Sequence, residues 1–317
     1  MNEKHAARGM TRRQFAGSLA GGLAGLCLAR RGFAQDSARP FRVAVSLETL
    51  AGANVNDARA AYKVWAREVT ASLGVKTAEL VPDIFVSSEQ IIRMVREQEI
   101  DLFGITAWEY AKLVDSVDPT SVLVEDSLAE GMEYVLLVHN ASSFKSLRDL
   151  HGGQITIHRH RDMNLVPAWI GNLLAADGLP RMDAFFANQI SNDSITQVVL
   201  PVFFRRIEAA CLSLRHFETA VEMNPQLGKD LRALEVSPKV IPIALCFRKN
   251  CSPEGKRVLK DAIARAATIP AGQQIVALYQ SRTLVSRPAS CMNDTIEMLR
   301  QYARVPARTP GARKERS

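Results

Sequence analysis

The chain has 317 residues, of which 47% are hydrophobic and 23% charged, and this composition excludes a disordered or fibrous protein. The length suits one large domain or two lobes, and no apolar run reaches the roughly 20 residues of a membrane span. The formal net charge is +7, but residues 1–34 carry +5 and residues 304–317 carry +4, so subtraction leaves −2 for residues 35–303. A nearly neutral body excludes a surface that tracks DNA.

Residues 1–34 have the pattern of an export signal. The pair Arg12-Arg13 precedes a weakly hydrophobic stretch, residues 16–29, that is too short to cross a bilayer. This order resembles a twin-arginine signal, and the small residues before Gln35 predict that the mature protein starts there. An ordinary secretory leader or a fortuitous basic terminus is the alternative. Either export route would deliver the mature chain to the periplasm.

Four cysteines remain after the predicted cleavage: Cys211, Cys246, Cys251 and Cys291. They allow three pairings, and the sequence does not choose among them. Cys211 lies in an apolar run that predicts core packing. In an oxidising compartment we therefore expect Cys251 to bridge either Cys246 or Cys291. No cysteine or histidine spacing indicates a zinc site, and we expect neither a metal nor another cofactor.

Strand and helix signals alternate along the first part of the mature chain. Ser87 with Gln90 and Thr106 with Glu109 have the spacing of capping boxes, each of which predicts the start of a helix. The expected elements, in order, are a strand at 41–45, a helix through 58–69 that ends at Gly74, an extended stretch at 75–81, a helix after Ser87, a strand at 100–105 and a helix after Thr106.

A second set of elements begins with the apolar strand 134–138. Ser252-Pro253 then predicts a later helix start, because proline is well suited to a first helical turn. Alternation of this kind predicts an α/β fold whose parallel sheets carry helices on both faces. The other expected elements are a helix at 146–150, a strand at 154–157, a helix at 165–176, strands at 207–212 and 240–247, helices at 273–280 and 294–304, and a disordered tail.

Several modest motifs in this order resemble the phosphonate, phosphite and phosphate branch of the type II periplasmic solute-binding proteins of ABC transporters. The likeness runs over about residues 40–300. It rests on the strands 41–46, 100–110 and 134–138, on the Ser-Leu-x-Asp-Leu-x-Gly element at 146–152, and on segments 217–225 and 246–249.

The resemblance implies a two-lobed α/β fold, each lobe a mostly parallel sheet with flanking helices. Two hinge strands would join the lobes, which close on a small solute and are presented to a membrane permease. The corresponding boundaries are residues 35–134 for the first part of lobe 1, 135–245 for lobe 2, 246–303 for the rest of lobe 1 and 304–317 for a basic tail.

In such a fold, loops after strands meet helix N-termini, whose N–H groups suit an anion. Four loops are therefore candidate ligand contacts. Tyr110 stands where the family has a ligand-contacting tyrosine, although core packing is the alternative. In the fourth loop, helix capping is the alternative to ligand contact. The candidates outside the third loop are Ser46, Glu48, Thr106, Trp108, Tyr110, Ser191, Asn192 and Asp193.

The third loop, His158-Arg159-His160-Arg161-Asp162, departs most from the family. Its relatives have serine-threonine-serine there, so the hydroxyl cradle for a phosphonate is absent. An arginine fork could replace it, and we expect Arg161→Ala to abolish anion binding with little effect on stability. The alternative is that these side chains are exposed to solvent at the edge of the cleft and do not contact the ligand. His158 and His160 have no evident third metal ligand in the sequence.

The resulting hypothesis is capture of a small anionic solute, phosphonate-like or another oxyanion, for an ABC importer. A periplasmic sensor that docks on a receptor kinase is the alternative. No motif indicates an enzyme, since the chain has no GxSxG elbow, no HExxH helix and no phosphate-cradling glycine loop. No nucleic-acid partner is expected.

Overall fold

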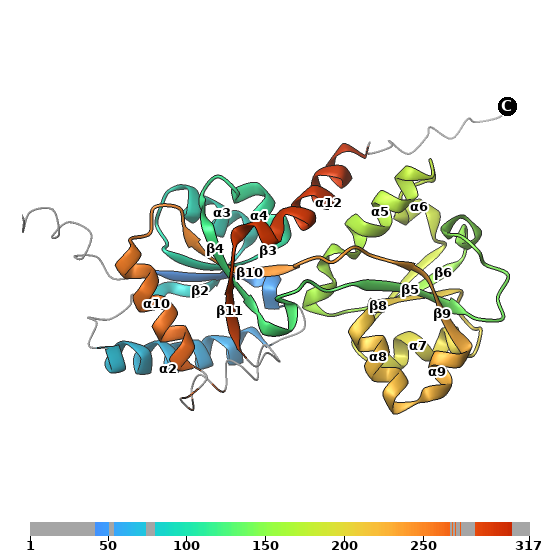
Figure 1. The fold of residues 1–317 in the computed structure, drawn as a ribbon, viewed down its shortest axis with the longest axis horizontal. Helices are drawn as coiled ribbons and strands as arrows, with labels where there is room; N and C mark the ends of the chain where they lie inside the picture. Colours follow the sequence, from blue (N-terminus) through green and yellow to red (C-terminus); the bar gives the residue numbers. More distant parts are fainter. Residues whose placement is uncertain are drawn as a thin grey trace, which may run out of the picture. The chain divides into compact units, whose positions relative to one another are not determined.

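Two mixed β-sheets organise the chain in the computed structural model, which describes residues 42–50, 54–73, 80–266, 268, 270, 273 and 283–305. The first sheet has the strand order β11-β4-β10-β3-β1-β2 (Figure 1). Its strands are β1 (Val43–Ser46), β2 (Leu80–Val86), β3 (Leu102–Thr106), β4 (Val117–Glu125), β10 (Ile243–Arg248) and β11 (Leu284–Arg287).

The second sheet contains only strands from the middle of the chain, in the order β7-β6-β8-β5-β9. The chain enters it at β5 and returns to the first sheet at β10, so each sheet belongs to a separate lobe. Its strands are β5 (Tyr134–His139), β6 (Gln154–His158), β7 (Asn188–Asn192), β8 (Ala209–Ser213) and β9 (Leu231–Val236).

Both sheets are mixed, but four of the six strands in the first and four of the five in the second run in the same direction, which agrees with the expected mostly parallel sheets. In the first sheet β3, β1 and β2 pair in parallel, whereas β10 and β11 run antiparallel to their neighbours. In the second sheet β6 pairs in parallel with β7 and β8, and β5 is antiparallel to β8 and β9. The strands β5 and β10 bring the chain in from the other lobe, and each is inserted against the direction of the parallel strands.

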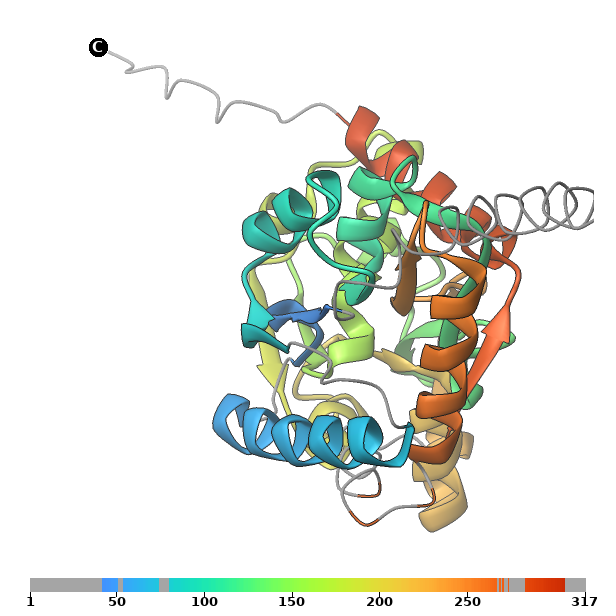
Figure 2. The same cartoon turned by 90° about the vertical axis from the view of Figure 1, so that its left-hand side faces the viewer.

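Helices cover both faces of each sheet (Figures 1 and 2). In lobe 1, α2 and α10 pack together beside one face, and α3 contacts α4 on the other. In lobe 2, α7 and α8 lie on one face and α5 on the other. The bounds are α2 (Val55–Leu73), α3 (Ser88–Arg96), α4 (Ala107–Leu113), α5 (Val166–Ala176), α6 (Met182–Phe185), α7 (Ile195–Phe203), α8 (Leu214–Met223), α9 (Pro225–Asp230), α10 (Pro253–Ala266) and α12 (Asn293–Arg304).

Local sequence accounts for the helix starts. The Ser87 side chain accepts from the Gln90 N–H at the start of α3, and Thr106 and Glu109 form a complete capping box at α4. Ser252 accepts from the Gly255 N–H before Pro253 opens α10. These starts agree with the predictions.

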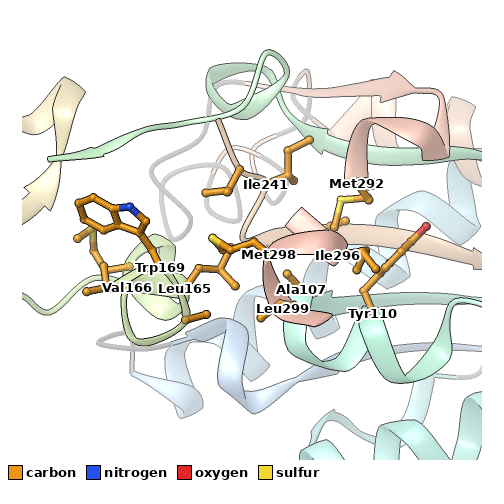
Figure 3. Packing of buried hydrophobic residues seen from close by; sticks show 14 of the residues in the cluster. Ala107, Tyr110, Leu165, Val166, Trp169, Ile241, Met292, Ile296, Met298 and Leu299 are labelled. Carbon is orange, nitrogen blue, oxygen red and sulfur yellow. The ribbon is translucent and has the colours of Figure 1, made fainter. Parts of the chain in front are cut away.

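The C-terminal helix α12 joins the cores of the two lobes. Figure 3 shows Met298 and Leu299 among side chains of α4 and α5, and one buried cluster includes apolar residues from both sheets. The Tyr302 ring lies against Gly171 of α5, where a Cβ atom would collide with it. Asn172 also donates to the Met298 carbonyl oxygen, at 2.9 Å. The lobes are therefore linked by α12 as well as by the segments before β5 and β10.

Other predictions differ from the structure or lie outside it. The extended stretch expected at 75–81 overlaps β2 (Leu80–Val86) at its end, and residues 75–79 lie outside the described residues. The strands β4, β7, β9 and β11 were not predicted. The expected disulfide is absent: Cys211, Cys246, Cys251 and Cys291 are all free. Because Cys246 is a fully buried strand residue, it packs in the core as Cys211 does. The leader with its cleavage site, most of helix 273–280 and the tail beyond residue 305 lie outside the described residues.

Within the part of the chain that the structure describes, no helix combines the length and the apolar character that crossing a membrane requires.

Candidate functional site

A cavity of about 530 Å³ lies against the carboxyl end of β6 in lobe 2 and reaches lobe 1 at Glu48. Glu48 is in the short 3₁₀ helix η1 (Leu47–Leu50) after β1, and the third loop follows β6, so both reach the cavity from strand ends. The predicted residues that line this cavity are Glu48, His158, Arg159, His160, Arg161 and Ser191.

Arg161 lies at the boundary between the lobes. It is the first residue of the 3₁₀ helix η4 (Arg161–Leu165), and its Nη2 donates to the carboxylate of Glu125, the last residue of β4 in lobe 1. Its Nε is 3.7 Å from Oδ1 of Asp162. Arg161 is 7% exposed and Glu125 is 9% exposed, so the ion pair is buried.

Burial of the Glu125 carboxylate raises its pKa, an effect larger than the opposing influence of Arg161. Burial also acts to raise the pKa of Asp162. There, however, the hydrogen bond from His160 and the charge of Arg161 together lower the pKa of the carboxyl group below its usual range. Asp162 is therefore the more stable anion of the two carboxylates beside Arg161.

Arg159 lies two residues earlier and has a different environment. Its Nε and Nη2 donate to the two carboxylate oxygens of Asp193, at 2.6 and 2.7 Å, and both side chains are more than half exposed. The hydrogen bond from Arg159 lowers the pKa of Asp193. This pair stays within lobe 2, at the ends of β6 and β7.

Three imidazole rings gather beside the loop. The ring centroids of His158, His160 and His216 are 5.0–5.5 Å apart, with His216 contributed by α8. Burial, and to a smaller extent the neighbouring imidazoles, lower the pKa of His158 and lower that of His216 to about 4. Both rings are therefore neutral at pH 7. Among the described residues, no group of three or more His, Cys, Asp or Glu side chains is arranged to hold a metal ion.

Ser46, at the end of β1, and Thr106, at the end of β3, both bond to Glu109 and do not line the cavity. The Ser46 hydroxyl donates to the Glu109 carboxylate, which also accepts from the Thr106 N–H at 2.8 Å and from its hydroxyl at 3.0 Å. Ser46, Thr106 and Glu109 are each at most 4% exposed. Glu109 thus closes the capping box of α4 and connects two strand ends of lobe 1.

The aromatic candidates of the second loop contact other parts of the protein. Trp108 Nε1 donates to the Asn164 carbonyl oxygen, at 3.0 Å, and its ring packs edge-on against Tyr302. Tyr110 is 4% exposed and lies in the apolar cluster of Figure 3. Tyr110 therefore packs in the core, which was the alternative to ligand contact.

In the fourth loop, Ser191 is exposed at the cavity, and the Asn192 side chain donates to the Thr156 hydroxyl at 3.3 Å. The side chain of the residue at the N-cap of α7, Ser194, makes no capping hydrogen bond. Glu208, directly before β8, accepts from the Gln154 N–H at 2.7 Å. That contact lies at the amino end of β6, the opposite end from the cavity.

Several residues at this site were not predicted. Glu125 and His216 come from β4 and α8, and Asn164, Arg181 and Tyr302 line the cavity from η4, the segment before α6, and α12. No pattern in the local sequence indicates that these residues belong to one site. They come from separate elements that meet only in the folded chain. Asn164 was the most accessible to prediction, since it lies two residues after the third loop.

Residues 50–287 match the family model described as "ABC transporter, phosphonate, periplasmic substrate-binding protein". No curated protein sequence matches the chain. Among solved structures, XAC2383 from Xanthomonas citri bound to ATP is 17% identical, covers 83% of this chain and 98% of its own, and has a TM-score of 0.52. PhnD1 from Prochlorococcus marinus in complex with methylphosphonate is 13% identical, covers 84% and 100%, and has a TM-score of 0.51.

At these identities the likeness shows a shared fold, and it confirms the expected two-lobed type II periplasmic-binding architecture. The family match spans most of the chain and confirms the resemblance seen in the sequence. The chain belongs to the phosphonate-type periplasmic substrate-binding proteins of ABC transporters.

Proposed function

We propose that this protein captures a small oxyanion in the cavity beside β6 and delivers it to an ABC permease. The observation that carries the proposal is that residues far apart in the sequence, including Glu48, Arg159, Arg161 and Ser191, surround one cavity at strand ends. Arg181 is a third arginine in its lining. Guanidinium groups are well suited to phosphonate, phosphate, sulfonate and carboxylate.

The choice of an importer follows from the family, which comprises transport proteins and not enzymes. It favours a permease as partner over a receptor kinase. Closure of the lobes around the solute would create the surface that the permease recognises.

Delivery to the periplasm would depend on the leader, for which we propose twin-arginine export with cleavage before Gln35. Replacement of Arg12 and Arg13 by lysine in the full chain should leave uncleaved protein in the cytoplasm. Cell fractionation with N-terminal sequencing of the exported form measures both points. Normal export of the lysine variant would contradict the twin-arginine route.

A thermal-shift screen of the purified protein tests the ligand class. The probes are methylphosphonate, inorganic phosphate, sulfate, methanesulfonate and acetate. ATP is added because XAC2383 was solved with it and because the cavity is much larger than methylphosphonate requires. A ligand at 100 times its dissociation constant stabilises the folded protein by about 2.7 kcal/mol. If none of these anions raises the melting temperature, the proposal of an oxyanion is wrong.

A further inference from the structure

The Glu125–Arg161 pair connects the two lobes through a buried contact. Glu125 ends β4, after which the chain leaves the first sheet, and Arg161 begins η4 at the end of β6 in the second. Both residues are less than 10% exposed. An ion pair in such a position is costly to form, since both groups lose their hydration.

Arg161 lies between two cavities. It lines the 530 Å³ cavity of the proposed solute, and with Glu125 it lines a second cavity of about 80 Å³. The rest of that smaller cavity is largely apolar and includes Val45, Leu123 and Ile243. In apolar surroundings a charge interacts more strongly with its counter-ion than it would in water. The Glu125 carboxylate therefore competes effectively with any anion that approaches Arg161.

A carboxylate and a phosphonate offer the same chemistry to a guanidinium group, namely anionic oxygens that accept its N–H groups. An oxyanion that approaches Arg161 would thus compete for its Nη2 group, the donor that Glu125 uses. Glu48, the glutamate that lines the larger cavity, is exposed, so water and salt screen its charge from the arginines of the loop.

We propose that Glu125 is an internal counter-ion that competes with the solute for Arg161 and thereby lowers the affinity of the cavity for oxyanions. The proposal rests on the proposed function. An oxyanion bound at Arg161 would displace Glu125, and because Glu125 belongs to the other lobe, binding would exchange a contact between lobes for a contact with the solute.

The test compares Glu125→Gln with a matched control, Asp118→Asn. Asp118 lies on the same strand, is 1% exposed and forms an ion pair with Lys256, but it does not line either cavity. Isothermal titration with methylphosphonate and with sulfate, at constant ionic strength, measures the dissociation constants. We expect Glu125→Gln to bind at least one of these probes at least tenfold more tightly than the wild type, and Asp118→Asn to remain within about twofold of it.

The outcomes separate this proposal from the proposed function. Binding by the wild type with no gain in Glu125→Gln overturns the counter-ion role and leaves the oxyanion function in place. Binding by Glu125→Gln alone supports the counter-ion role and contradicts oxyanion capture by the wild type. If neither protein binds any of the probes, both proposals fail.

A second variant covers the case in which Glu125→Gln does not fold. Glu125→Ala leaves space beside Arg161, and we expect added formate to raise its melting temperature by several degrees more than chloride does. Asp118→Ala is the control and should respond equally to both salts. A Glu125→Ala protein that formate does not stabilise, or that stays unfolded in formate, overturns the proposal.

Discussion

The two arginines of the third loop are two residues apart and have different physical roles. Arg159 forms a well-aligned bidentate pair with Asp193, but water surrounds both side chains. Arg161 pairs with Glu125 where both are buried and belong to different lobes. Exposed ion pairs contribute little to stability, whereas the removal of one partner of a buried pair leaves a charge without compensation. Burial, more than residue type or hydrogen-bond geometry, therefore decides what each pair contributes.

Arg161→Ala should produce the largest change. We expect it to reduce the free energy of unfolding by about 3–5 kcal/mol, because the Glu125 carboxylate would stay buried without its cation. This differs from the sequence-based expectation of nearly unchanged stability, which assumed a solvent-facing arginine. Urea unfolding followed by circular dichroism measures the effect. A loss below about 1 kcal/mol would show that Glu125 rehydrates or protonates at little cost.

Ser46→Ala tests a buried carboxylate that has neutral donors in place of an arginine. The variant removes one donor from Glu109, which is 1% exposed, and should cost about 1–3 kcal/mol. Urea unfolding measures it, with Ser191→Ala as the control, since Ser191 is exposed. Equal stability of the two variants would mean that Thr106 alone satisfies the Glu109 carboxylate.

The pH dependence of stability should have opposite signs at the two pairs. Burial raises the pKa of Glu125 in the folded protein, so the folded state holds more protons just above the pKa of an unfolded glutamate. Stability therefore falls as pH rises through that interval, by at most about 1.4 kcal/mol per pH unit. Glu125→Gln should remove this fall.

The hydrogen bond from Arg159 lowers the pKa of Asp193, so its contribution is present above the pKa of an unfolded aspartate and is lost as pH falls. Unfolding curves of the wild type, Glu125→Gln and Asp193→Asn between pH 3 and 7 compare the two slopes. The difference in unfolding free energy between the wild type and each variant is compared as a function of pH. If it changes with pH in the same direction for both variants, folding does not shift the two pKa values in opposite directions.

Asp193→Asn should have the smallest effect at pH 7. Both partners of the Arg159 pair are exposed, so water replaces most of the lost hydrogen bonding and the melting temperature should fall only slightly. Differential scanning calorimetry at about 0.1 M salt, where surface charges are partly screened, is the measurement. A clear loss of stability would show that the turn after β7 depends on this contact.

The sequence predicted the family, the alternation of strands and helices and the main helix starts. Each of these depends on residues that are close together in the chain. The Thr106 capping box is one such local signal. The mixed direction of the sheets was not predictable from alternation, since it depends on where β5 and β10 are inserted. The free cysteines were not predictable either, because composition and compartment do not report whether two thiols meet.

At the candidate site, the sequence by itself determined which residue types occupy the third loop, namely two histidines, two arginines and an aspartate. Tertiary structure alone decided that Arg161 is buried against Glu125 while Arg159 is exposed beside Asp193. The physical reason is that the energy of a charge depends on its solvation and on partners from distant segments. Neither of these is determined by the residues next to it in the chain.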